Sequence, residues 1–170
     1  MRIASATAAH PKQGQPGFPG AEPQFFTAHE MATVRVLVDL IIPRDARSGS
    51  ATDAGVPEFM DFMLNERENA RAGMRGGLAW LDRECHRRFG RTFVACDGAQ
   101  RTAVLYDVAW PERARPEMSH GVAFFNRFRD LVASGFWSSE MGIRDLQYIG
   151  NTAVPVWNGC PPEAVRKLGL

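Results

Sequence analysis

The chain has 170 residues, of which 45% are hydrophobic and 23% charged, and its formal net charge at pH 7 is +1. These values are ordinary for a globular protein of one domain, and a chain of this length folds without disulfides or metals. The near-neutral charge, with no basic run on a predicted helix face, argues against nucleic-acid binding. No apolar run approaches the roughly 18 residues of a transmembrane helix.

The first 24 residues are rich in Gly, Pro, Gln and Ala and poor in apolar side chains. We therefore expect a flexible N-terminal arm over 1–24 and a helical domain over 25–170. The arm lacks the apolar core and the twin arginine of an export signal. Its overlapping Ala-x-Ala patterns, Ala4–Ala6 and Ala6–Ala8, are of the kind that precedes a signal cleavage site. The tail of a signal peptide and chance in an alanine-rich stretch both stay open.

The first helix is predicted after a capping box formed by Thr27 and Glu30, and Pro43 ends it. Its apolar positions follow a 3.6-residue period: Met31, Val34, Leu37, Val38 and Ile41. A polar loop follows, and Pro57 suits the first turn of a second helix. The expected buried face of the second helix carries Phe59, Phe62 and Met63.

Three longer helices are expected next. The third runs from about 69 to 89 and has one apolar stripe: Met74, Leu78, Leu81, Cys85 and Phe89. The fourth begins at a cap on Asp97 and ends near Pro111, with Val104, Leu105 and Val108 along it. The fifth spans about 117–136 and turns Phe125, Phe128, Leu131 and Val132 inward.

Helical periodicity fails after Gly135, apart from a short helix expected over 162–168. The C-terminal segment, rich in Gly, Pro and Trp, is therefore predicted to be irregular. No strand-like alternation of convincing length is present. The predicted fold is all-α, with about five main helices in one domain.

No cofactor motif accompanies these helices. The sequence has neither a G-x-G-x-x-G pattern nor a P-loop, and Cys85-His86 lacks the C-x-x-C-H pattern of covalent haem because residue 82 is Asp. His29, His86 and His120 are scattered, and each is expected at the surface or in a satisfied hydrogen bond. We predict no catalytic residue, no bound cofactor and no metal ligand in this chain.

Four carboxylates lie around the first loop: Asp45, Asp53, Glu58 and Asp61. They could hold a divalent cation, so a stand-alone small-molecule or metal-binding protein that uses the loop near Asp53 is our alternative function. EF-hand spacing is absent, however, and Arg44 and Arg47 lie among the carboxylates. Loop capping and solvated ion pairs are therefore favoured.

The chain has three cysteines, Cys85, Cys96 and Cys160. Cys85 lies on an apolar stripe, which favours a small core residue, and an intrachain disulfide with Cys96 is a candidate. A catalytic cysteine is a third hypothesis. It has only Cys85-His86 to support it, and adjacent residues on a helix point to different faces. Cys160 lies between a turn and two prolines, so we expect an accessible loop thiol.

Three long motifs, "IPRD…SATDAGVPEF", "SGFWSSEMGI…DLQYIGN" and "WNGCPPE", resemble the gluconate 2-dehydrogenase subunit 3 family over about 26–170. These proteins are small subunits of bacterial membrane-associated sugar and sugar-acid dehydrogenases, including glucose dehydrogenases. The resemblance implies a large subunit of the glucose–methanol–choline type that oxidises CH–OH groups on FAD. It also implies a multihaem cytochrome c subunit, with haem c, at the membrane.

The resemblance further implies that the small subunit holds neither flavin nor haem and assists the folding and export of the large subunit. The expected location is the periplasm, with membrane association through the complex rather than through a span of this chain. No twin-arginine signal precedes the family motifs in the chain as given, which leaves the export role and a cytoplasmic location open.

A partner interface is expected in the segment 134–163, which holds two of the four tryptophans, four glycines and three prolines. Trp and Tyr are enriched among interface anchors, and Gly and Pro let a loop follow another protein's surface. The interface candidates are Trp137, Tyr148, Asn151, Trp157 and Cys160. The alternative is a lid over the helices, and the two roles are compatible.

Cys160 is also a candidate for a disulfide to the flavoprotein. In a periplasmic complex in which Cys85 pairs with Cys96, Cys160 is the cysteine left over, and an oxidising compartment favours an intermolecular bond. The alternative is a free thiol buried at the interface.

Overall fold

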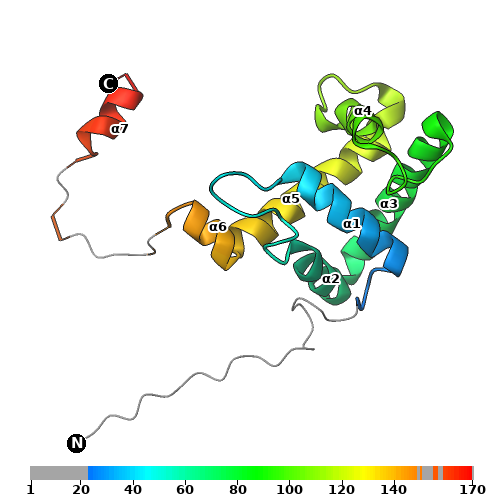
Figure 1. Ribbon diagram of the computed structural model, residues 1–170, viewed down its shortest axis with the longest axis horizontal. Coiled ribbons are helices and arrows are strands. Elements are labelled where there is room, and N and C mark those ends of the chain that lie inside the picture. The colour runs from blue at the N-terminus through cyan, green and yellow to red at the C-terminus, as the bar shows by residue number, and fades with distance from the viewer. Residues whose placement is uncertain (1–22, 149, 151–154, 157–158, 170) are drawn as a thin grey trace, which may run out of the picture.

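The computed structural model of the chain describes residues 23–148, 150, 155–156 and 159–169. The regular elements in these ranges are all helices, which confirms the predicted all-α fold (Figure 1). They are α1 (Ala28–Ile41), α2 (Val56–Glu66), α3 (Glu68–Phe89), α4 (Gly98–Ala109), a 3₁₀ turn (Pro116–Met118), α5 (Ser119–Ser138), α6 (Glu140–Asp145) and α7 (Pro162–Lys167). The arm predicted over 1–24 lies outside the described residues except for Pro23 and Gln24.

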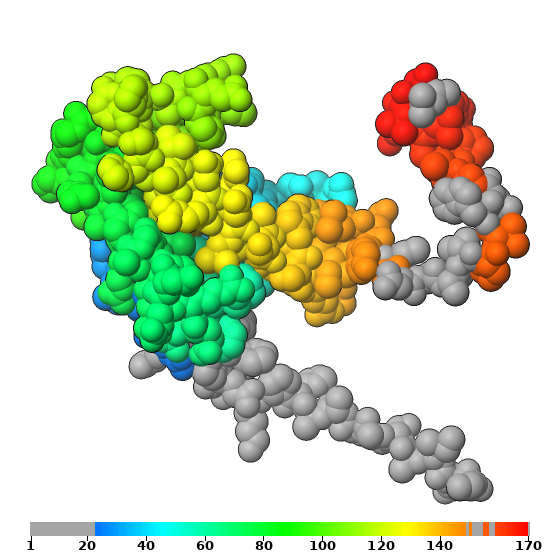
Figure 2. Space-filling model, turned by 180° about the vertical axis from the view of Figure 1, so that it is seen from behind, coloured from blue at the N-terminus to red at the C-terminus, as the bar shows by residue number. Residues whose placement is uncertain are grey.

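The helix α5 organises the body, because α1, α2, α3, α4 and α6 all pack against it. Its inner face carries the fully buried side chains of Phe128, Val132 and Phe136. Of the positions predicted to face inward, Ile41, Phe89, Leu105 and Leu131 are half-buried at the edge of the core. The helix α6 lies at one end of this body and α4 near the other (Figure 2).

Two helices begin at the capping boxes that the sequence predicts. The Thr27 hydroxyl accepts from the Glu30 N–H at 3.2 Å, and the Glu30 carboxylate accepts from the Thr27 N–H at 2.8 Å. Asp97 and Gln100 make the same reciprocal pair at the start of α4, at 2.8 and 3.2 Å. Each box satisfies backbone donors that the first helical turn leaves unpaired.

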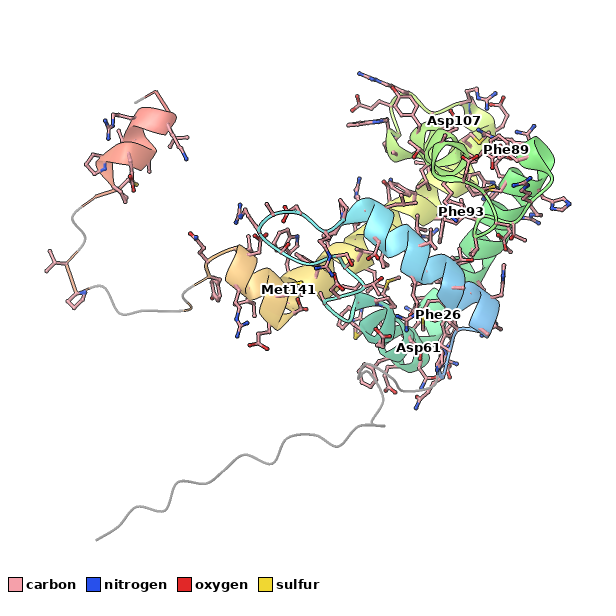
Figure 3. All side chains as sticks on the ribbon, in the orientation of Figure 1. Phe26, Asp61, Phe89, Phe93, Asp107 and Met141 are labelled. Atoms are coloured by element: carbon pink, nitrogen blue, oxygen red, sulfur yellow. The ribbon has the colours of Figure 1, made fainter. Side chains whose placement is uncertain are left out.

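The predicted inner face of α2 is wrong in part, because Phe59 and Met63 are half-buried, with Phe59 packed against the core, but Phe62 turns outward. Phe62 is 39% exposed, and the buried apolar residues of α2 are Val56, Pro57, Met60 and Leu64. The cause is Asp61, which is 6% exposed and accepts hydrogen bonds from the backbone N–H groups of residues 24, 25 and 26. Figure 3 shows Asp61 beside Phe26. This polar anchor rotates α2 so that Phe62 turns outward.

The chain after Gly135 is more regular than predicted. The helix α5 continues to Ser138, and α6 follows after a single residue, Ser139, whose hydroxyl accepts from the Gly142 N–H at 3.1 Å. A side chain at Gly142 would place its Cβ 2.0 Å from the carbonyl oxygen of Phe136, so the tight turn requires glycine there. A helix of six residues is too short to show a period in sequence.

Candidate functional site

Exposed apolar side chains gather at the C-terminal end of the molecule. Ten large hydrophobic residues are exposed in the described part of the chain, and six of them lie in its last fifth. They are Trp137 (40%), Ile143 (38%), Leu146 (56%), Tyr148 (62%), Val156 (69%) and Leu168 (72%). Four of them lie in the last turn of α5, on α6 or directly after it, and exposed apolar residues that lie close together are typical of interaction surfaces.

We call Trp137, Ile143, Leu146 and Tyr148 the C-terminal apolar face. Trp137 lies in the last turn of α5, and its ring packs edge-on against buried Phe136, with 4.9 Å between the ring centroids. The other three residues lie on or directly after α6. The Tyr148 N–H donates to the Ile143 carbonyl at 3.1 Å, which holds the chain close to α6 where the helix ends. The end of α5 and the helix α6 therefore support the C-terminal apolar face.

The interface residues predicted from the sequence fall into two groups. Trp137, Tyr148 and Cys160 are exposed, as an interface requires before its partner binds. Asn151 and Trp157 lie outside the described residues. Trp137 packs its ring against Phe136 while 40% of the residue remains accessible, an arrangement compatible with both expected roles.

A polar cleft of about 700 Å³ lies beside this face, between the loop 42–55 and α6. Its walls are joined by Arg47, which forms an ion pair with the Asp145 carboxylate at 2.9 Å and donates to the Asp145 carbonyl at 2.6 Å. Met141, labelled in Figure 3, contacts Gly49 at the base of the cleft, where a Cβ would lie 3.0 Å from its methyl carbon. Two of the sequence motifs thus meet here.

The loop carboxylates are already engaged. Asp45 accepts from the N–H groups of Ser48 and Arg47, both at 2.8 Å, and these bonds lower the pKa of its carboxyl group. The Ser50 N–H likewise lowers the pKa of Asp53, which also pairs with Arg44 at 2.6 Å.

Glu58 pairs with Arg35, and Asp61 binds the backbone before α1. In the described ranges no group of three or more His, Cys, Asp or Glu is placed to hold a metal ion. The carboxylates therefore act as caps and ion-pair partners, as the sequence favours, and their contacts lend no support to the metal-binding alternative.

The cysteines occupy two environments. Cys85 and Cys96 are buried and adjacent, whereas Cys160 is exposed, as predicted for a loop thiol. Burial, together with the neighbouring Cys96, raises the pKa of the Cys85 thiol to about 12. A nucleophilic cysteine needs a stabilised thiolate, and His86 points to solvent, so these features argue against a catalytic role for Cys85.

Sequence reasoning missed a second apolar surface, a groove of about 410 Å³ between α1, α4 and α5. Its exposed apolar members are Leu40 (40%), Tyr106 (63%) and Trp110 (56%). The available signal was the position of Tyr106, which lies off the Val104–Val108 stripe of α4. The groove contacts α5 at Phe125 and Arg129, in the first part of the helix, whereas the C-terminal apolar face begins at Trp137 in its last turn.

A family model described as gluconate 2-dehydrogenase subunit 3 matches residues 28–159. The match includes α1 to α6, the polar cleft and the whole C-terminal apolar face, and it leaves out α7. No curated protein and no solved structure matches the chain. In the described residues, no helix has both the length and the apolar character needed to cross a membrane. Because the match covers most of the sequence, the chain belongs to the gluconate 2-dehydrogenase subunit 3 family.

Proposed function

We propose that this chain is a non-catalytic accessory subunit of a sugar or sugar-acid dehydrogenase complex. In this proposal the C-terminal apolar face binds an FAD-containing large subunit of the glucose–methanol–choline type. A cytochrome c subunit with several haems completes the complex in the periplasm. Family membership supports the place in a dehydrogenase complex. The observation that carries the docking site is the clustering of exposed apolar residues on and after α6.

Burial of exposed apolar surface would drive this association. Aromatic side chains bring large contact areas at low entropic cost, and the exposed parts of Leu146 and Tyr148 are in water until a partner covers them. The partner must offer a matching apolar surface, which would be exposed when this chain is missing. An accessory subunit of this kind therefore assists folding, solubility and export of the larger protein.

The polar cleft gives the docking site its specificity in this proposal. The charged side chains of Arg47, Glu140 and Arg144 line the cleft next to the apolar face, so a partner meets both apolar and charged groups. Complementary charge selects partners and orients them more than it adds affinity. Cys160, which is exposed, would add a disulfide to the flavoprotein if a partner cysteine lies close enough.

Co-expression with the FAD-containing subunit tests the proposal. We expect the two chains to purify together, with a flavin spectrum that belongs to the large subunit. This chain purified alone is expected to show neither flavin nor Soret absorption and no dehydrogenase activity. Equal yields of soluble, active large subunit with and without this chain would contradict the accessory role.

A further inference from the structure

Two cysteine side chains meet inside the core, between α3 and the turn before α4. Cys85 lies in the last part of α3 and is 0% exposed, and Cys96 directly precedes the capping residue Asp97 and is 3% exposed. Cys96 is close enough to contribute to the raised pKa of the Cys85 thiol, and in the structure both cysteines are free. The two buried cysteines of the chain are therefore neighbours, although the backbone reverses direction between them.

The turn is held against α3 by contacts that involve neither sulfur. The Asp82 carboxylate on α3 accepts from the Phe93 N–H at 2.8 Å. The Arg101 guanidinium on α4 donates to the carbonyls of Phe93 and Val94 at 3.1 and 2.5 Å. Phe93, labelled in Figure 3, is 0% exposed and belongs to the same core. In the folded chain these contacts hold Cys96 on the side of α3 that carries Cys85, whether or not a covalent bond joins the two residues.

We propose that Cys85 and Cys96 form an intrachain disulfide when the chain folds in an oxidising environment. One thiol attacks the disulfide of a thiol–disulfide oxidant and forms a mixed disulfide, and the second thiol then displaces the oxidant. The two cysteines lose two protons and two electrons, one Sγ–Sγ bond forms, and the disulfide of the oxidant is reduced to two thiol groups. This inference concerns the chain alone and does not depend on the partner-binding role.

Burial determines when this bond can form. Exchange requires a thiolate that the oxidant can reach, and neither sulfur is accessible in the folded chain. The pKa of Cys85, raised to about 12 chiefly by burial, makes its thiolate scarce at neutral pH. Oxidation therefore precedes closure of the core, and afterwards reductants cannot reach the bond. The pair is a structural cross-link and not a reversible redox switch.

The expected gain in stability follows from the short loop that the bond closes. A disulfide across a loop of this size restricts the unfolded chain enough to raise the melting temperature by about 5–10 °C in a protein of this length. The gain requires little native-state strain, which is favoured because the turn that carries Cys96 is already held against α3 by the bond between Asp82 and the Phe93 N–H.

Oxidative refolding tests the proposal. The full chain carrying Cys160→Ser, which removes intermolecular disulfides, is refolded from urea in a glutathione redox buffer, then denatured and alkylated. Mass spectrometry of the peptides should show Cys85 linked to Cys96 and neither of them alkylated. The oxidised chain should melt about 5–10 °C above the same chain reduced in urea and refolded without oxidant.

Two controls sharpen the result. The variant Cys85→Ala/Cys96→Ala in the same Cys160→Ser background should melt at the same temperature after refolding with and without oxidant. The folded reduced chain should oxidise at least about tenfold more slowly than the chain in urea, because its thiols are buried. Alkylation of both cysteines after oxidative refolding would overturn the proposed disulfide. Equal oxidation rates for the folded chain and the chain in urea would overturn the claim that burial in the folded chain protects the thiols from the oxidant.

Discussion

Asp61 is predicted to be a main tie between α2 and the chain that enters α1. Its carboxylate accepts three backbone hydrogen bonds, from Gln24 at 2.7 Å, Phe25 at 3.0 Å and Phe26 at 2.8 Å. Phe25 and Phe26 are themselves 6% and 4% exposed, so their N–H groups have little access to water once the carboxylate is removed. The substitution Asp61→Ala leaves these donors without a partner.

The expected cost follows from the number of donors. A buried donor left unsatisfied costs about 1–3 kcal/mol, and hydrogen bonds to a charged group lie at the upper end of the usual range. With two buried donors and a third that water can reach, we expect Asp61→Ala to lower the free energy of unfolding by about 3–5 kcal/mol. Asp61→Asn should cost about 1–3 kcal/mol, because the amide oxygen can still serve Phe25 and Phe26 while the amide group opposes the Gln24 N–H.

Urea unfolding followed by circular dichroism measures these values. Glu66→Ala is the matched control, since Glu66 is an exposed carboxylate on the same helix and its loss should change the free energy of unfolding by no more than about 0.5 kcal/mol. A loss below about 1 kcal/mol for Asp61→Ala would refute the role of Asp61 as an anchor. If the Asn variant were as unstable as the Ala variant, the amide oxygen would not be replacing the carboxylate as acceptor for the Phe25 and Phe26 N–H groups.

Three further predictions concern packing, pH and the exposed thiol. Gly77→Ala would place a Cβ 1.8 Å from the Phe124 ring and force α3 away from α5, so we expect a loss of about 1–3 kcal/mol in unfolding free energy by urea titration. The pKa of Glu84 is lowered from 4.5 to about 2, first by its hydrogen bond with Arg87, so its stabilising effect is complete above pH 4.5 and is lost as the pH falls towards 2. Acid titration of stability should show this loss in the wild type and a flatter profile in Glu84→Gln. Non-reducing electrophoresis of the purified complex should show a heavier band that reductant splits and that Cys160→Ser abolishes, and two separate bands without reductant would exclude the cross-link.

Local signals account for the parts of the fold that the sequence predicts well. The capping boxes at Thr27 and Asp97 are complete within four residues, so both helix starts could be located before any tertiary contact was known. The apolar stripe of α3 is long enough for its period to be clear, and Met74, Leu78, Leu81 and Cys85 are all buried. Such features depend on neighbours along the chain.

The features that the sequence did not predict depend on distant contacts. The face of α2 is decided by Asp61 bonding to a segment 35 residues earlier, which outweighs the aromatic pattern that favoured Phe62. The polar cleft is closed by Arg47 and Asp145, which are 98 residues apart. The groove around Trp110 requires three helices to come together. The composition predicted a candidate interface in the C-terminal segment, but it did not predict the helix α6, which carries part of the C-terminal apolar face.

The central claim is that the C-terminal apolar face binds the large subunit. The most direct test compares two tyrosines of equal exposure at opposite ends of the body, Tyr148 at 62% and Tyr106 at 63%. Binding of the purified FAD-containing subunit to Tyr148→Ala and to Tyr106→Ala is measured by surface plasmon resonance. The account predicts that Tyr148→Ala weakens binding at least about tenfold, as an interface anchor does, and that Tyr106→Ala leaves it unchanged. Equal affinities for both variants, or a loss confined to Tyr106→Ala, would contradict it.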